Sequence, residues 1–316
     1  MISTKFISLM AGAAMLATAA CGGTSAPASS SPERSAAPDS ASTQATGVVR
    51  IGFTSSITGS LTNESKEQTQ GLQLWADGVN AAGGIQAGAQ KMRVELKSYD
   101  DESKQDRVQQ LYTRLITEDK VDFLISPYSS GMAAASAVVT EQYGKTNLLV
   151  GAADDGAFSR GYKHAFQVYS PGSKYLTGAL DMLAKADPNA RRVALVNEKE
   201  PFSTGVVKAA SDYAEQHGVT VVLNEGYDTG TSDFAPFISK IAGATPDAIL
   251  GGGHFADGST LARQLSEKQV KAKFVTLLVA PADPKFAQLG DGALGVVAPS
   301  QWEPQVTYSA QAAQEL

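Results

Sequence analysis

The sequence predicts an α/β fold of two lobes, each built on a parallel β-sheet with helices on both faces. Short apolar segments alternate with longer amphipathic ones from residue 48 to residue 298, which is the spacing of βαβ units. These units form two series that meet near residues 166–171. A cleft between two such lobes is the expected place for a ligand.

The first series contains apolar strand segments separated by amphipathic helices. A Gly pair at 83–84 ends the first helix. Strands are predicted at 48–54, 92–99, from 121, from 148 and at 166–169, with helices at 64–81, 103–119 and 132–143.

The second series repeats this alternation after a helix at 174–186. Strands are predicted at 192–196, 219–224, 248–250, 274–278 and 295–298, with helices at 203–216, 234–242 and 259–268.

Composition limits the classes of function. The chain has 316 residues, of which 43% are hydrophobic, enough for one large or two medium domains. Its net charge of -6 argues against nucleic acid or an anionic membrane surface as a direct partner. Three His and one Cys leave little material for a metal site, so no metal or cofactor is predicted. No apolar stretch is long enough to predict a transmembrane helix.

Residues 1–21 have the pattern of a bacterial signal peptide: Lys5 is followed by an Ala-rich apolar run. The run ends Thr18-Ala-Ala-Cys-Gly22, which resembles a lipobox, and Cys21 is then the expected lipidation site. Thr18 departs from the usual Leu of that motif. A buried structural Cys is the alternative.

Residues 22–46 are rich in Ser, Ala, Pro and Thr and have no hydrophobic periodicity. Such a segment cannot bury a core, so it is predicted to be a disordered tether. Together with the leader, it places the folded part outside the cytoplasmic membrane on a lipid anchor.

The stretch from Val121 to Asp155 carries the clearest candidate site. It predicts a strand, a polar turn, a helix, a second strand and a second polar turn. Ser129 and Ser130 stand where the first turn enters the helix, and their hydroxyls and the helix N–H groups favour an anion such as a carboxylate. The simpler interpretation is that a Ser before a helix is an N-cap.

Four short sequence segments resemble those of a known family. They are residues 51–54 followed by Thr-Gly at 58–59, Asn80-Ala-Ala-Gly-Gly-Ile85, Tyr99-Asp-Asp101 and Ser126-Pro-Tyr-Ser-Ser130. Their order is similar to that in substrate-binding proteins of branched-chain amino acid ABC transporters. The resemblance implies the type I periplasmic-binding fold, two Rossmann-like lobes crossed by hinge strands. Lobe one would be 47–167, lobe two 168–298, and 299–316 would return to lobe one.

The resemblance also implies a site. The family holds a ligand carboxylate with a Ser and its backbone N–H, which corresponds to Ser130, with Ser129 and Tyr128 adjacent. A backbone carbonyl and N–H pair after the next strand corresponds to Ala152 and Ala153.

Other positions depart from the family. Asp154 stands where a hydroxyl residue is common, and an acid would attract an ammonium rather than donate to a carboxylate. Phe202 takes the position of an aromatic ligand cover, and His254 that of a Tyr in some members. The acid that meets the ligand ammonium is missing near Leu278.

The family normally continues for several more βα units, whereas this sequence stops at Leu316. The expectation is a fragment or truncated product whose first lobe exposes a sheet edge and an apolar docking surface.

Enzyme motifs are weak. Gly251-Gly-Gly253 suggests a dinucleotide loop but lacks the full spacing. Asp100-Asp101 and Asp154-Asp155 suggest paired carboxylates or a cation site, against the simpler interpretation of solvated helix caps. No nucleophile elbow, Walker loop or zinc spacing is present.

The sequence therefore predicts a lipid-anchored extracytoplasmic receptor, not an enzyme, that captures an amino acid or a related carboxylate or amide and delivers it to an ABC permease. A sensing domain for a membrane partner and a secreted hydrolase are the alternatives.

Overall fold

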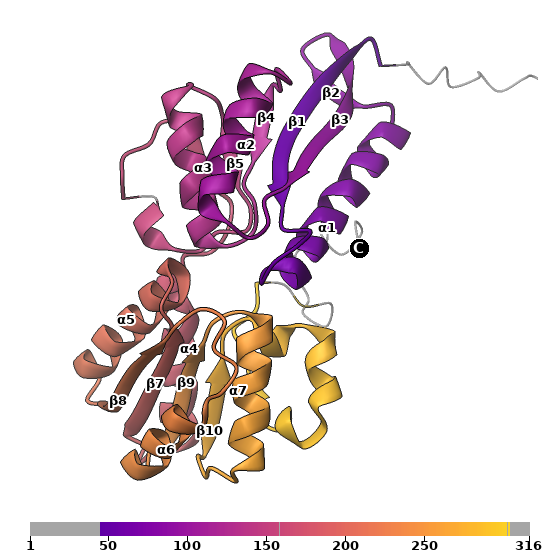
Figure 1. Ribbon diagram of the computed structural model, residues 1–316. Coiled ribbons are helices and arrows are strands. Elements are labelled where there is room, and N and C mark those ends of the chain that lie inside the picture. Colours follow the sequence, from indigo (N-terminus) through magenta and orange to yellow (C-terminus); the bar gives the residue numbers. More distant parts are fainter. Residues whose placement is uncertain (1–44, 158, 302, 304–316) are drawn as a thin grey trace, which may run out of the picture. The chain divides into compact units, whose positions relative to one another are not determined.

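The computed structural model describes residues 45–157, 159–301 and 303, which belong to the unit Ser42–Leu316 (Figure 1). The predicted signal peptide, Cys21, the tether up to residue 44 and Trp302 lie outside the described residues. None of the described helices is both long enough and apolar enough to cross a membrane.

The first sheet has six strands in the order β2-β3-β1-β4-β5-β6. All neighbours are parallel except β2, which pairs antiparallel with β3. The strands are β1 (Gly47–Ser55), β2 (Ile85–Ala87), β3 (Gln90–Asp100), β4 (Phe123–Ile125), β5 (Asn147–Leu149) and β6 (Ala165–Gln167). The helices are α1 (Thr62–Ala81), α2 (Gln105–Thr117) and α3 (Ser130–Gln142).

The second sheet has five strands in the order β11-β10-β9-β7-β8, all parallel. The strands are β7 (Arg192–Glu198), β8 (Thr220–Tyr227), β9 (Ala248–Gly252), β10 (Phe274–Leu277) and β11 (Val296–Val297). The helices are α4 (Tyr175–Ala186), α5 (Pro201–Gln216), α6 (Ala235–Ala244) and α7 (Phe255–Glu267).

The parallel strands of both sheets follow the same order: the second strand, the first, then the third, fourth and fifth. The connections therefore leave in opposite directions on the two sides of the first strand. That reversal lies between β1 and β4 in one sheet and between β7 and β9 in the other. In doubly wound sheets a ligand crevice opens at this point, outside the carboxyl ends of the strands.

The core of the second sheet shows why these apolar runs become buried parallel strands. Val193 and Leu195 of β7 pack into a cluster with α4 and α5, while Ala194 and Val196 face a cluster with α6 and α7. Both faces of the strand are thus covered, which is why the sequence is continuously apolar rather than alternating. The predicted α/β architecture is confirmed.

The structure differs from the sequence prediction at several element boundaries. Strand β2 was not expected. It forms a hairpin with β3 through Gly88, whose φ of +61° favours glycine. Helix α3 begins at Ser130 rather than 132, and α7 begins at Phe255 rather than 259. In consequence Ser130 and His254 lie at the start of helices.

Two 3₁₀ segments, Ala280–Ala282 and Pro284–Gly292, were also not predicted. Asp283 stands between them, and its carboxylate accepts a hydrogen bond from the N–H of Lys285 at 2.7 Å. This local cap precedes Pro284, the first residue of the second segment, and hydrophobic periodicity does not contain such a signal.

Part of the apolar surface of the first sheet is exposed. Strand register places Leu148 beside Phe166, and these side chains are 37% and 50% exposed. Phe123 of β4 is 47% exposed. On α1, Leu74 and Trp75 also lie outward, at 75% and 42% exposure, whereas Leu72 and Val79 pack against the core.

Candidate ligand-binding site

The turn after β4 enters helix α3 through Ser129, whose backbone has φ 79° and ψ 147°. A residue with a Cβ rarely adopts this conformation, and such strain gathers at binding sites. The Ser129 hydroxyl accepts a hydrogen bond from the N–H of Met132 at 3.4 Å, so the residue is an N-cap as well as a cavity residue.

Ser130 ties this turn to the turn after β5. Its Oγ accepts hydrogen bonds from the N–H groups of Ala153 and Asp154, both at 3.0 Å, and the residue is 2% exposed. Both acceptor positions of the hydroxyl are used, which leaves its single hydrogen to donate. A ligand carboxylate is an acceptor for that hydrogen.

The backbone groups of Ala152 and Ala153 already have internal partners. The Ala152 carbonyl accepts from the Gln167 side chain at 3.0 Å, and the Ala153 carbonyl accepts from the N–H of Gly172 at 2.6 Å. A carbonyl oxygen keeps a second lone pair for a ligand. Ala153 lines the cavity described below, whereas Ala152 is fully buried behind it.

Asp154 stabilises the turn after β5, in which it lies. Its Oδ1 accepts a hydrogen bond from the N–H of Gly156 at 3.2 Å, and the carboxylate lies against the backbone of Gly205 at the start of α5. Asp154 is not among the residues that line the cavity.

A row of rings crosses from the first sheet to the second. Tyr128 and His254 are in edge contact at 5.5 Å between centroids, and the Tyr128 hydroxyl lies 3.0 Å from His254 Nδ1. Phe202 lies 6.0 Å from His254 and 5.8 Å from Tyr175. Phe202 is 6% exposed and belongs to the core of the second sheet, so it both packs and covers the site.

These residues surround a cavity of about 410 Å³. Six of the eight predicted ligand residues line it: Tyr128, Ser129, Ser130, Ala153, Phe202 and His254. Leu278, near which the sequence lacks the family's acid, also lines the cavity. Residues that the sequence did not single out complete the wall, among them Glu64, Glu67, Gln68, Tyr169, Tyr175 and Gln301. The site thus draws on α1, the turns after β4, β5, β7, β9 and β10, and the segment after β11.

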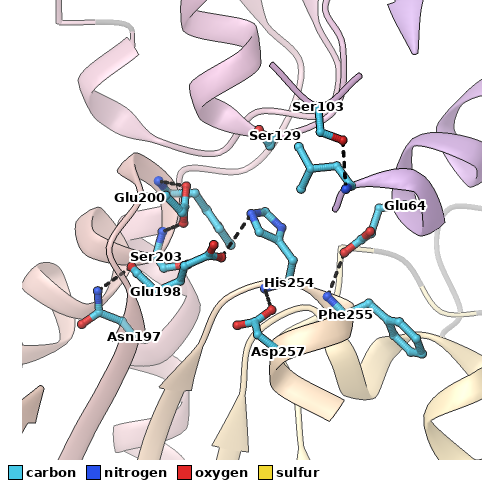
Figure 2. Close-up of polar contacts among 12 residues, drawn as sticks. Glu64, Ser103, Ser129, Asn197, Glu198, Glu200, Ser203, His254, Phe255 and Asp257 are labelled. Carbon is cyan, nitrogen blue, oxygen red and sulfur yellow. Dashed lines mark hydrogen bonds and ion pairs between the residues drawn. The ribbon is translucent and has the colours of Figure 1, made fainter. Parts of the chain in front are cut away.

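A second cavity of about 300 Å³ shares Ser129 and His254 with the first. Glu198, Glu200 and Asp257 line it, around the carboxyl ends of β7 and β9 (Figure 2). No described Lys or Arg lines either cavity. Burial raises the pKa of the Glu198 carboxyl, and the nearby His254 acts in the opposite direction.

Sequence reasoning missed Glu198 and Glu200, although both follow the first strand of the second series, where doubly wound sheets bind ligands. Glu200 caps α5: its carboxylate accepts from the N–H of Phe202 at 2.8 Å and also from that of Ser203. Asp257 accepts from the N–H of His254 at 2.8 Å. These caps fix the start of each helix beside the cavity.

The paired acids at 100–101 stabilise a turn. Asp100 accepts hydrogen bonds from the N–H groups of Ile57 and Glu102 at 3.0 and 2.9 Å. Asp101 accepts from the Ser56 hydroxyl at 2.6 Å. The geometry shows acids that hold a turn rather than a hydrolytic pair, although Asp101 is fully buried rather than solvated and neither acid is the N-cap of α2.

The strained backbone at Ser129 leads to a stability prediction. Replacing Ser129 with Gly relieves about 1–3 kcal/mol of strain. It loses only a few tenths of a kcal/mol of capping and adds about 0.5–1 kcal/mol of backbone entropy cost. We expect the free energy of unfolding, measured in denaturant, to rise by about 1 kcal/mol. Ser129→Ala keeps the strain but loses the cap, so it should fall by about 1 kcal/mol. Equal effects of the two substitutions would contradict strain at this turn.

Two doubly wound sheets with a cavity lined from both define a two-lobed binding protein. The family model described as "Periplasmic binding protein" matches residues 48–315, and the chain belongs to that family. Leu/Ile/Val-binding protein homolog 8 of Brucella abortus is 27% identical over 230 residues, covering 71% of this chain and 56% of the relative. An amino acid binding protein of Pseudomonas aeruginosa is 24% identical over 235 residues, which are 74% of this chain and 62% of that relative. The chain thus spans less than two thirds of the length of these relatives.

Solved structures share the fold. The branched-chain amino acid transporter substrate binding protein LivJ from Streptococcus pneumoniae, in complex with isoleucine, has a TM-score of 0.70 at 22% identity, covering 84% of this chain and 75% of that one. A solute binding protein of an ABC transporter from Rhodopseudomonas palustris, in complex with 3,4-dihydroxy benzoic acid, has a TM-score of 0.67 at 20% identity, covering 79% and 67%. The type I periplasmic-binding architecture expected from the sequence is confirmed.

Proposed function

We propose that the chain is the extracytoplasmic solute receptor of an ABC importer and that it binds a small zwitterion, with an amino acid as the first candidate. The observation that carries this proposal is the cavity in which six predicted ligand residues meet. Ser130 offers a hydroxyl hydrogen to a carboxylate at one side, and Glu64 and Glu67 line the same cavity. A ligand with both charges satisfies both sets of groups.

Closure of the two lobes over the ligand would bury it and present the closed form to a permease. The rings of Phe202, His254 and Tyr128 would then cover the apolar part of the ligand, as such rings do in other small-molecule sites. Two relatives are named as a Leu/Ile/Val-binding protein homolog and as an amino acid binding protein, and these names support this ligand class.

We also propose a receptor rather than an enzyme. Hydrolysis by nucleophilic attack needs a hydroxyl paired with a base. In the cavity, the Ser129 hydroxyl accepts from a helix N–H, and Nδ1 of His254 faces the Tyr128 hydroxyl. Turnover of a bound ester or amide would contradict the receptor assignment.

The lipid anchor at Cys21 and the extracytoplasmic location complete the proposal. They are supported by the leader sequence and by the family match. Fractionation of producing cells tests this part, because a Cys21→Ala chain should leave the membrane fraction while the parent chain stays in it.

Thermal unfolding with three matched compounds tests the ligand class: leucine, its amine-free analogue 4-methylpentanoate, and leucinamide. A ligand at 100 times its Kd should stabilise the chain by about 2.7 kcal/mol, which is several degrees in Tm. We expect leucine to raise Tm and both analogues to raise it less, because each lacks one of the two charged groups. A larger shift from 4-methylpentanoate would favour a carboxylic acid ligand. If none of the three compounds shifts Tm, the other amino acids are tested in the same way, and no shift from any of them would contradict the proposal.

A further inference from the structure

The second cavity brings together three groups that can bind a metal ion. Glu198 and His254 are buried, and Glu200 is half-buried. One ligand atom from each, a carboxylate oxygen or an imidazole nitrogen, lies within 4.8 Å of the others. Glu198 ends β7, Glu200 lies in the turn after it, and His254 lies in the turn after β9; these two strands flank the crevice of the second sheet (Figure 2).

The imidazole of His254 is oriented as in a metal ligand. Its side chain is 8% exposed, and Nδ1 lies 3.0 Å from the hydroxyl of Tyr128. In one of the two imidazole tautomers, Nδ1 carries the hydrogen and donates it to the phenol oxygen of Tyr128. This tautomer leaves a lone pair on Nε2. A histidine that binds metal usually donates its other N–H to an oxygen in this manner.

Nε2 is directed at Glu198. It lies 4.0 Å from the Glu198 Oε2, which is too long for a hydrogen bond. Two ligands of one tetrahedral ion, each about 2.1 Å from the metal, are about 3.4 Å apart. A movement of roughly half an ångström would therefore let both groups bind the same ion. A carboxylate oxygen of Glu200 already lies within 4.8 Å of the other two ligand atoms and keeps a second lone pair for the ion while it caps α5.

Charge favours a cation here. Glu198, Glu200 and Asp257 line the cavity, and no described Lys or Arg does so. A buried carboxylate is costly unless a positive charge compensates it. A divalent ion would balance the two Glu charges, and imidazole with carboxylate ligands suits Zn²⁺ or a similar transition metal better than Mg²⁺ or Ca²⁺, which prefer oxygen ligands only.

We propose that Glu198, Glu200 and His254 bind a divalent transition metal ion, with Zn²⁺ as the first choice. Because His254 also lines the ligand cavity and contacts Tyr128, the ion would stiffen the wall that separates the two cavities. The proposal is independent of the organic ligand, since the metal titration requires none.

The test uses the full chain, treated with a chelator and then titrated with ZnCl₂ in a calorimeter, with MgCl₂ and CaCl₂ as comparison ions. We expect binding of one Zn²⁺ and much weaker binding of the other two. His254→Gln and Glu198→Gln should each weaken Zn²⁺ binding by about tenfold or more, and Tyr128→Phe, which removes only the orienting oxygen, by about tenfold.

His217→Gln is the matched control, because His217 is exposed and stacks on Tyr213 away from the cavity. Its Zn²⁺ affinity should equal that of the parent chain. Circular dichroism verifies that each variant is folded. Absence of Zn²⁺ binding, or equal affinity in the His254→Gln and His217→Gln chains, would overturn the proposal, as would stronger binding of Mg²⁺ than of Zn²⁺.

Discussion

Replacing Ser130 with alanine is expected to lower the free energy of unfolding by about 2–4 kcal/mol and to weaken ligand binding. The hydroxyl accepts from two buried N–H groups, those of Ala153 and Asp154. Each buried donor left without an acceptor costs about 1–3 kcal/mol. The same substitution removes the hydrogen that we assign to the ligand carboxylate, so both properties should fall together.

Urea unfolding measures the first effect, and the Tm shift with leucine measures the second. Ser239→Ala is the control, because the Ser239 hydroxyl is exposed on α6 and donates only to the Ala235 carbonyl of its own helix, at 2.9 Å. It should change stability by less than about 0.5 kcal/mol. A Ser130→Ala chain of parental stability would contradict the two-acceptor geometry. A destabilised chain with unchanged ligand affinity would show that the hydroxyl shapes the turn but does not hold the ligand.

The fold could be predicted because the central strands are apolar and the second sheet is covered on both faces. Continuous apolar runs such as Val193 to Val196 suit a parallel strand covered on both faces, and the helices between them carry amphipathic periodicity. The hairpin strand β2 was not predicted because it is three residues long and partly exposed. Its sequence signal is the turn at Gly88 rather than a hydrophobic pattern.

The part of the site that the first sheet contributes could also be predicted from local sequence. Ser129 and Ser130 follow an apolar strand and precede a helix, so the sequence alone places them at the carboxyl edge. That Ser130 contacts Ala153 depends on strands β4 and β5 being neighbours, which local sequence does not encode. The likeness to a family supplied that pairing.

The acids of the second sheet were harder to find. Glu198 and Glu200 belong to a polar segment between a strand and a helix. In such a segment the sequence does not distinguish a ligand-binding acid from a solvated helix cap, and Glu200 does cap α5. Their proximity to His254 arises only when β7 and β9 pair, about 50 residues apart in the sequence. A search at the reversal point of each predicted sheet would have singled them out.

The three glycines at 251–253 illustrate how steric demands can resemble a nucleotide motif. The backbone of Gly251 has φ +140°, and a Cβ there would lie 1.8 Å from the carbonyl oxygen of Val196 on the neighbouring strand. At Gly253 a Cβ would lie 2.6 Å from the Glu198 carboxylate and 2.5 Å from that of Asp257. Absence of side chains lets β9 and its turn approach β7, which explains the run without a dinucleotide.

This close approach predicts a large effect for Gly251→Ala, a loss of about 4 kcal/mol in the free energy of unfolding. The clash is with backbone, which cannot rotate away, so the strand must shift or the residue must leave a conformation that only glycine adopts readily. Because Gly251 precedes His254 by three residues, the shift should also weaken every interaction that depends on the position of the imidazole.

Gly178→Ala provides the matched substitution, since Gly178 is exposed in helix α4 and a Cβ there meets no atom within 4 Å. Alanine should stabilise that helix by up to about 1 kcal/mol. Urea unfolding of the two variants beside the parent chain therefore gives opposite signs for the same chemical change. Similar small effects at both positions would mean that β9 does not lie as close to β7 as the structure places it, and the grouping of His254 with Glu198 would lose its support.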